Sequence, residues 1–434
     1  MIEGFSLLSQ NDKLRIISSL MPDFPETENL LKSFRHDNPN VQKIIDEIAE
    51  NTISNYHLPF AVAPNFLING KEYIVPMVIE ESSVVAAAAY AARFWAKNGG
   101  FHARIVSDSK TGQIHFLWHG HIKKLEKKLL LLERFLRDKT FDLTNKMEKR
   151  GGGIRSVQIH TNHEINPVYY QLFVTFGTAD AMGANFINSV LERMALVLKD
   201  FFLQHFPLWP EPEVIMAILS NYTPDCMVEV EISAPISAFE SVSASLSPAV
   251  FAERFVLAID IAKKDVYRAV THNKGIMNGV DAILLATGND FRAVEAGVHA
   301  WASRNGRYES LSNARIEKDQ LVVNLSLPLS LGVTGGLTSL HPLAAFSIRL
   351  LGNPSARELM QIVAATGLAS HFSAIRALIT TGIQKGHMKM HLNNILSVLN
   401  ATPEEKQKAE MHFHKRPISF TAVQDFIDNL RKST

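Results

Sequence analysis

Apolar residues recur along the chain with two different periods, and these periods predict where helices and strands alternate. The alanine-rich segment 82–97 has a helical period and is followed by a pair of glycines that end it. Segments 102–108 and 112–119 alternate between apolar and polar residues, as strands do, and segment 122–138 returns to an amphipathic helical period. The lysines of this last segment are expected to form a solvated face.

A second run of mixed elements follows three glycines at 151–153. Segments 154–162 and 168–177 predict two strands joined by a turn, and segment 180–202 predicts a long helix. Two helices and several strands in this order indicate a compact α+β unit inserted into a larger domain. We therefore expect the first part of a large domain at 1–108 and an inserted small domain at 109–217, after which the large domain resumes.

Composition narrows the class of protein. Lys plus Arg (44) nearly balances Asp plus Glu (43), so no broad field attracts nucleic acid or an anionic membrane. The single cysteine, Cys226, excludes an intrachain disulfide and fits a reducing compartment, so we expect a cytoplasmic protein. The N-terminus does not have the pattern of a signal peptide, and the apolar runs fall short of the ~20 residues that a bilayer requires.

Lys274 and Asp290 lie at the two ends of a short apolar run, sixteen positions apart. On a straight helix that separation is roughly 24 Å, and on a strand it is longer. The side chains therefore meet only if the chain folds back between them, or if they come from two subunits. Taken alone, the residues favour a simpler interpretation, in which Lys274 caps a loop and Asp290 is the N-cap of a helix.

The segment TADAMGANFIN leads from a predicted strand into a predicted helix, with Gly183 near the turn. Backbone N–H groups at such a helix start can bind a pyrophosphate. The pattern is not G-x-G-x-x-G, however, and Asp180 as an N-cap, with Gly183 permitting close packing, accounts for it equally well.

Two histidines and two glutamates are further candidates for chemistry. His387 and His391 are four positions apart and would share a helix face, but H-E-x-x-H is absent and no third ligand is evident, so we predict no metal. The glycine before His387 leaves room for a substrate. Glu80 and Glu81 end an apolar run, where a carboxyl group is either solvated or partly buried with a proton available for transfer.

Six stretches together resemble one family, in the family's order: AVAPNFLING, EESSVVAAA, DAMGAN, THNKGIMNG, ATGNDFRAVEAG and KGHM. They resemble the bacterial, soluble class of 3-hydroxy-3-methylglutaryl-coenzyme A (HMG-CoA) reductase. The resemblance runs from about Gly4 to the C-terminal region.

The resemblance implies an enzyme that interconverts HMG-CoA and mevalonate plus CoA with two NADH or NADPH, through mevaldyl-CoA and mevaldehyde. This reaction serves isoprenoid biosynthesis by the mevalonate pathway, or mevalonate catabolism. The implied α+β fold has a large, mainly helical CoA-binding domain with a second part at 218–375, a ferredoxin-like nicotinamide domain inserted at 109–217, and a helical C-terminal flap at 376–434. The family's homodimer builds each active site at the subunit interface.

By motif match, four residues correspond to the family's catalytic groups. Lys274 of HNKG matches the lysine that stabilises the oxyanion formed when hydride reaches the carbonyl. Glu81 of EESS matches the proton-donating glutamate, and Asp290 of TGND matches the aspartate that hydrogen-bonds this group. His387 of GHM matches the histidine that protonates the departing CoA thiolate.

The resemblance also implies binding residues. The hydroxymethylglutaryl group is expected to contact Ser83, Arg268 and Asn278, and an arginine suits its free carboxylate because the fork is bidentate. The nicotinamide nucleotide is expected to contact Asp180, Met182, Gly183, Asn185 and Asn221.

The sequence departs from the family pattern at some positions. Ser82 replaces the proline of the usual EEPS, which affects turn stiffness more than chemistry. Ser6 stands where some members carry a basic residue near the CoA phosphates. Lys146, Lys149 and Arg150 suit a 2′-phosphate, whereas Asp142 suits a free ribose, so the choice between NADPH and NADH stays open.

Two other functions are compatible with CoA binding. One is a non-catalytic acyl-CoA sensor, against which the presence of all four catalytic positions argues. The other is a CoA-thioester reductase that stops at the aldehyde.

Overall fold

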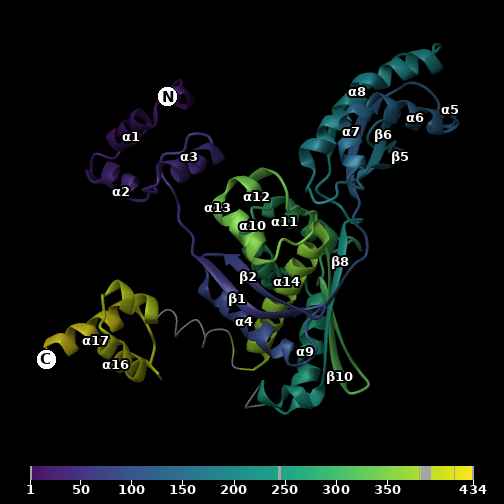
Figure 1. Cartoon of the computed structure of the whole chain (residues 1–434). Coiled ribbons are helices and arrows are strands. Elements are labelled where there is room, and N and C mark those ends of the chain that lie inside the picture. The colour runs from purple at the N-terminus through teal and green to yellow at the C-terminus, as the bar shows by residue number, and fades with distance from the viewer. Residues whose placement is uncertain (1, 243–245, 381, 383–391, 415, 433–434) are drawn as a thin grey trace.

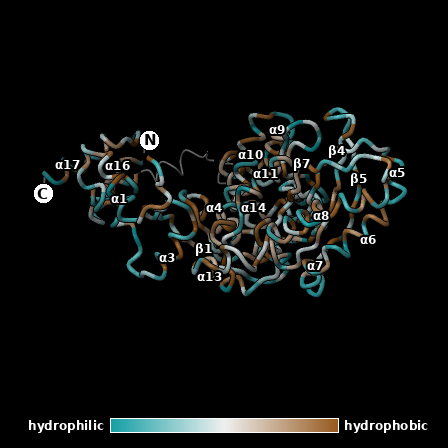
Figure 2. The backbone as a smooth tube through the Cα atoms, turned by 90° about the horizontal axis from the view of Figure 1, so that it is seen from above, coloured by the Kyte–Doolittle hydropathy of each residue, from teal (hydrophilic) through white to brown (hydrophobic). Residues whose placement is uncertain are grey.

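The computed structural model describes residues 2–242, 246–380, 382, 392–414 and 416–432. Figure 1 shows a central unit with a small unit at its upper right, and separate N-terminal and C-terminal groups of helices on the opposite side. Figure 2, seen from above, places both terminal groups at that same side of the central unit. The N-terminal group contains η1 (Phe5–Leu7), α1 (Gln10–Ser19), α2 (Thr27–Ser33) and α3 (Pro39–Ile48).

The central unit is formed by two stretches of chain that flank the small unit. The first contributes β1 (Phe60–Ile68), β2 (Lys71–Val78), α4 (Ser82–Ala96) and β3 (His102–Ile105). The second contributes β8 (Met227–Pro235), η2 (Ile236–Ser241), α9 (Pro248–Lys264), α10 (Val266–Thr287), α11 (Phe291–Ala302), β9 (Ser312–Glu317), β10 (Gln320–Pro328), α12 (Gly336–Leu340), α13 (Pro342–Leu350) and α14 (Ala356–Ile379). The antiparallel sheet β3-β8-β10-β9 joins both stretches, so neither forms this core alone.

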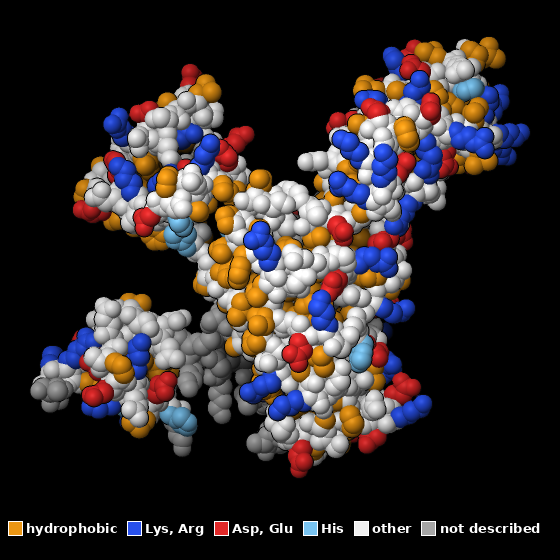
Figure 3. Space-filling model, viewed as in Figure 1, with side chains coloured by type: hydrophobic (Ala, Val, Ile, Leu, Met, Phe, Trp, Pro, Cys, Tyr) orange, Lys and Arg blue, Asp and Glu red, His pale blue; other side chains and the backbone are white. Residues whose placement is uncertain are grey.

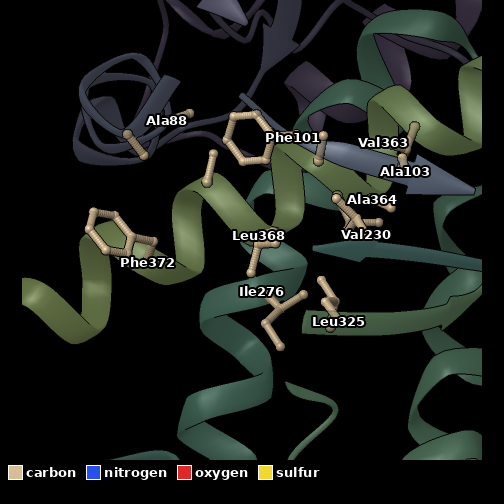
Figure 4. Close-up of a cluster of buried hydrophobic side chains, with 14 of the residues drawn as sticks. Ala88, Phe101, Ala103, Val230, Ile276, Leu325, Val363, Ala364, Leu368 and Phe372 are labelled. Atoms are coloured by element: carbon tan, nitrogen blue, oxygen red, sulfur yellow. The ribbon is translucent and has the colours of Figure 1, made fainter. Parts of the chain in front are cut away.

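Helix α14 is the centre of this core. It packs against α4, α10 and the sheet, and Figure 4 shows Leu368 and Phe372 of α14 among side chains from these neighbours. Two glycines allow α10 and α14 to approach closely: a Cβ on Gly279 would lie 2.6 Å from the Thr366 carbonyl oxygen, and one on Gly367 would lie 2.9 Å from Val280. The side chains of α10 that face α4 and α14 are therefore held on a rigid base.

Helix α14 also corrects one expectation from the sequence. Among the described residues it is the one helix long and apolar enough to cross a membrane, so the expectation that no segment reaches that length is wrong. However, 72% of its most apolar window is buried inside the protein. The core of the central unit thus accounts for its hydropathy.

The small unit spans Lys110–Leu219 and has a hydrophobic core of its own. Its elements are β4 (Lys110–Leu117), α5 (Ile122–Glu126), α6 (Leu129–Lys139), α7 (Phe141–Glu148), β5 (Gly153–Thr161), β6 (Tyr169–Gly177), α8 (Ala184–His205) and β7 (Glu213–Leu219). The chain order is β-α-β-β-α-β, with the helical segment before β5 divided into three, and all neighbours in the sheet β5-β6-β4-β7 are antiparallel.

Several predicted elements differ in detail. The single helix expected over 122–138 is two helices, because the chain leaves helical geometry at Lys128. Helix α8 begins at Ala184 rather than at 180, because Gly183 has a left-handed φ of 92°. Strands β7 and β9 were not predicted.

The C-terminal group contains residues 392–398, which are helical, together with α16 (Pro403–Phe413) and α17 (Phe420–Lys432). These elements share a small hydrophobic cluster that includes Leu396, Phe413 and Ile427. A capping box of Thr402 and Glu405 starts α16.

Candidate active site

A cavity of about 760 Å³ lies where α4, α10 and α14 meet. Its lining includes five residues that the sequence analysis assigned to catalysis or substrate binding: Glu81, Ser83, Arg268, Lys274 and Asn278. The cavity is large enough for a small-molecule substrate and has both apolar walls and charged groups.

Helix α10 supplies three of these side chains. Its N-cap is Asp265, whose carboxylate accepts hydrogen bonds from the Tyr267 and Arg268 backbone N–H groups. Lys274 and Asn278 are one turn apart and therefore share a face. Burial lowers the pKa of the Arg268 guanidinium, and the nearby Asp265 opposes that shift, so the arginine remains a cation suited to a carboxylate.

Glu81 lies between β2 and α4, in extended conformation directly before the first helical residue. Its side chain is 34% exposed, whereas Glu80 is exposed to solvent, so Glu81 is the partly buried carboxyl group of the two. The Ser83 hydroxyl donates a hydrogen bond to Glu81 Oε1, and Lys274 Nζ lies 3.9 Å from Glu81 Oε2. A carboxyl group, a hydroxyl and an ammonium thus converge at one end of the cavity.

The floor of the cavity contains two buried histidines that the sequence analysis missed. His272 and His371 lie edge to face, with ring centroids 4.2 Å apart, and Ser312 Oγ lies 2.9 Å from an Nε2 atom of each. Burial and the nearby Arg268 lower the pKa of His272 to about 3. Burial, His272 and Arg268 lower the pKa of His371 well below its usual value. Both rings are therefore neutral near pH 7. The sequence offered a signal for His371, which is a polar residue inside the mainly apolar stretch 359–375.

Asp290 lies apart from Lys274. It is the N-cap of α11, as predicted, since its carboxylate accepts a hydrogen bond from the Ala293 N–H; it also contacts Arg292. Lys274 does not cap a loop, because it is in the interior of α10. From Lys274 the helix continues unbroken for thirteen residues to Thr287, which at 1.5 Å per residue is roughly 20 Å. The chain therefore does not fold back between the two residues, and within one chain they do not meet.

The residues expected to bind the nicotinamide nucleotide lie at the junction of the two units. Asp180 is not the N-cap of α8: its Oδ1 accepts a hydrogen bond of 2.8 Å from the N–H of Ala356, the first residue of α14. Gly183 has the N-cap position of α8 and provides the close packing that was predicted, because a Cβ there would lie 2.4 Å from Thr178 Cγ2. No side chain accepts a hydrogen bond from the first N–H groups of α8.

The other three nucleotide candidates lie in this loop, in the first turn of α8 and after β7. The Met182 backbone packs against Gly332, where a Cβ would lie 2.3 Å from Met182 N, and Asn185 is exposed in the first turn of α8. Asn221 follows β7, and its carbonyl oxygen lies 2.6 Å from the Cβ position of Gly297 in α11. All five nucleotide candidates are described, and none of them lines the cavity.

His387 and His391 lie outside the described residues, so the roles expected of them stay predictions. Within the described part of the chain, no group of three or more His, Cys, Asp or Glu side chains could hold a metal ion.

Comparisons with known proteins agree with the motifs. A family model described as hydroxymethylglutaryl-coenzyme A reductase matches residues 10–392. A 3-hydroxy-3-methylglutaryl-coenzyme A reductase of Archaeoglobus fulgidus is 34% identical over 392 residues, which cover 89% of this chain and 86% of that relative. The chain belongs to the hydroxymethylglutaryl-coenzyme A reductase family.

Solved structures of HMG-CoA reductases support the same assignment. A reductase from Streptococcus pneumoniae matches with a TM-score of 0.71 and 35% identity, covering 99% of each chain. A class II reductase from the same organism, bound to NADPH in open conformations, matches with a TM-score of 0.70 and 36% identity over 87% of this chain and 99% of its own. The predicted family is thus confirmed, and the chain is an oxidoreductase with a mixed helix and sheet fold.

Proposed function

We propose that this chain converts HMG-CoA, two NAD(P)H and two protons into mevalonate, CoA and two NAD(P)⁺, or catalyses the reverse. The observation that carries the proposal is the cavity in which Glu81, Lys274, Ser83, Arg268 and Asn278 converge in a member of this reductase family. The reaction would place the enzyme in mevalonate metabolism.

Each of these side chains has a chemical role that its position supports. The Lys274 ammonium stabilises the negative charge that develops on the substrate oxygen, and Glu81, 3.9 Å away, supplies the proton to that oxygen. Ser83 orients Glu81 through their hydrogen bond. Arg268 binds the free carboxylate of the hydroxymethylglutaryl group, and Asn278 holds its polar oxygens.

The nicotinamide nucleotide fits the loop that precedes α8. The uncapped N-terminus of this 22-residue helix presents N–H groups, and Gly183 allows close approach of a pyrophosphate. Asp180, Met182, Gly183, Asn185 and Asn221 would surround the nucleotide, which supplies the hydride when bound. The β-α-β-β-α-β order and strand order support a ferredoxin-like nucleotide domain at 109–217, inserted between large-domain parts at 1–108 and 218–375.

The active site is completed by a second copy of the chain. Lys274 and Asp290 do not meet within one chain, although both match the family's catalytic positions. An exposed apolar surface on the central unit gives a second copy a place to pack, and Figure 3 shows such side chains gathered on the side that bears α12, α13 and the β1–β2 hairpin. Its members include Val62, Ile74, Leu337, Leu340, Leu343 and Phe346.

The C-terminal segment 376–434 serves as a flap that carries His387, the acid for the departing thiolate. The balanced charge, the single buried cysteine and the similarity to class II reductases support a cytoplasmic enzyme.

Product stoichiometry tests the proposed function. The purified protein is incubated with HMG-CoA and either NADH or NADPH, and nucleotide oxidation, free thiol and mevalonate are measured together. We expect two nucleotides oxidised per CoA released. A ratio of one with an aldehyde product would identify the reductase that stops at the aldehyde, and binding without oxidation would identify a sensor. The two initial rates also show which nucleotide is preferred. NADPH would agree with the exposed Lys146, Lys149 and Arg150 near the end of α7, and NADH with the exposed Asp142.

A further inference from the structure

Lys110, the first residue of β4, is a buried cation that the catalytic scheme does not use. The residue is 5% exposed, and its Nζ contacts four oxygens: Thr178 Oγ1 at 2.6 Å, the Ala181 carbonyl at 2.7 Å, the Met182 carbonyl at 2.8 Å and the Leu331 carbonyl at 3.3 Å. An ammonium has three donors, so these neutral acceptors use its full capacity.

The four acceptors come from two segments of the chain, the loop between β6 and α8 and the segment after β10. Thr178 follows β6, Ala181 and Met182 form the loop before α8, and Leu331 belongs to the central unit after β10. Asp180 also connects this loop to the central unit: its carbonyl accepts hydrogen bonds from the Val333 N–H at 2.9 Å and the Thr334 hydroxyl at 3.3 Å, and its carboxylate accepts one from the Ala356 N–H at 2.8 Å. One ammonium thus connects the small unit, the nucleotide loop and the central unit.

Lys110 is charged near neutral pH. Burial lowers its pKa to about 8, Cys226 and Asp108 oppose this shift, and Arg155 adds to it. A buried ammonium is stable only where oxygens replace its hydration, and the carbonyls of the loop provide this in one loop conformation.

We propose that Lys110 is a positioning residue for the nicotinamide nucleotide: its ammonium fixes the loop 178–183 against Leu331 and so sets the place of the nucleotide relative to the substrate cavity. The expected changes in KM rest on the proposed function, whereas the role of Lys110 in fixing the loop does not. Lys110 itself touches neither substrate nor the reacting atoms.

The substitution Lys110→Met keeps the length and removes the charge. We expect KM for the nicotinamide nucleotide to rise roughly 10- to 100-fold, the usual worth of charge-assisted hydrogen bonds, while KM for HMG-CoA stays within about 2-fold. The control is Lys127→Met at the exposed end of α5, which should leave both constants unchanged. Equal changes in the two KM values, or none, would overturn the proposal.

Chemical rescue separates charge from packing. Lys110→Ala lacks the atoms of propylammonium, so propylammonium should restore nucleotide affinity, whereas propanol of similar size should not. Rescue by both compounds, or by neither, would show that the ammonium is not what holds the loop. Should the Lys110 variants not fold, Thr178→Val removes one acceptor at constant shape and should raise the nucleotide KM in the same direction; an unchanged KM would refute the role.

Hydrogen exchange tests the positioning independently of activity. In Lys110→Met the amides of Ala181 and Val333, which bond to the Thr178 and Asp180 carbonyls, should exchange faster while those inside α14 do not change. Unchanged exchange at Ala181 and Val333 would reject the clamp. A wild-type protein without reductase activity would refute the proposed function alone, because this exchange result does not depend on turnover.

Discussion

Lys274 is 65% exposed on the wall of the cavity, with Glu81 as a carboxylate neighbour at 3.9 Å. We expect Lys274→Ala to lower the rates of both HMG-CoA reduction and reduction of added mevaldehyde by at least roughly 10²-fold, because each step builds negative charge on the same oxygen. Lys274→Arg should also fail, since a planar guanidinium does not replace a compact ammonium. Nucleotide oxidation measures both steps.

The matched control for these variants is Lys264→Ala, at the exposed end of α9. It should retain both activities. A Lys274→Ala enzyme that reduces mevaldehyde at the wild-type rate would assign the lysine to the thioester step alone and contradict the shared role.

His387 lies outside the described residues, so its proposed role rests on the GHM motif. A thiol has a pKa of about 8.5 and an imidazole one of about 6.5, so an imidazolium can protonate a departing thiolate near neutral pH. Because only the release of CoA needs that proton, His387→Gln should slow thioester reduction by roughly 10²- to 10⁴-fold and leave mevaldehyde reduction near wild type. Equal losses in both assays would exclude this role, and His391→Gln is the matched control.

The packing of α10 on α14 is an element-scale feature with a measurable pH dependence. His272 on α10 and His371 on α14 are buried and neutral, and their pKa values in the folded protein are lowered, to about 3 for His272. In the unfolded chain each has a pKa of about 6.5, so below that pH the unfolded state binds more protons. The free energy of unfolding should therefore fall as the pH drops below about 6.5, by up to ~1.4 kcal/mol per pH unit for each histidine.

Urea denaturation at pH 7, 6 and 5 measures this dependence. The variant His371→Gln should have a shallower fall than wild type between pH 6 and 5, whatever its stability at pH 7. His163→Gln, on an exposed loop, is the control and should keep the wild-type slope. Parallel curves for wild type and His371→Gln would mean that this histidine is not neutral when folded.

At the scale of the whole molecule, the separation of Lys274 from Asp290 predicts complementation between subunits. Inactive Lys274→Ala and Asp290→Ala proteins, mixed under conditions of subunit exchange, should regain activity because a mixed dimer has one intact site. With random exchange, a symmetric dimer would recover about a quarter of wild-type activity. No recovery after demonstrated exchange would contradict a shared site.

The cavity offers a stringent control for that experiment. Glu81 and Lys274 line the same cavity of one chain, so a mixture of Glu81→Ala with Lys274→Ala should stay inactive. Recovery in this mixture would show that the two side chains act across subunits instead.

Elements with an unambiguous local pattern were predictable. The alanine-rich helix α4 and the strands β5 and β6 lie where apolar periodicity placed them. The break between α5 and α6 was not predicted, because the apolar pattern continues through it. Strand β7 was missed because residues 214–219 are all apolar, so the sequence shows no alternation there, although Ile215 and Ile218 are exposed in the structure.

Among the candidate site residues, short motifs identified those whose partners are close in the sequence. Lys274 and Asn278 are one helical turn apart, so spacing alone places them on one face. Glu81 and Ser83 are two positions apart and meet because Glu81 is the extended N-cap of α4. Lys110 was overlooked, although it occupies the same side of its strand as the buried Ile114 and Phe116.

By itself the sequence determined the family, the candidate catalytic residues and those elements that have a clear apolar period, because motifs and periodicity are properties of neighbouring residues. The tertiary structure alone decided that Asp180 accepts a hydrogen bond from the first residue of α14 instead of capping α8, that Lys110 joins β4 to the loop 178–183 and Leu331, and that α10 holds Lys274 away from Asp290. These contacts join residues up to 221 positions apart. Their partners are chosen by how the two units and their helices pack, and local spacing carries no information about that packing.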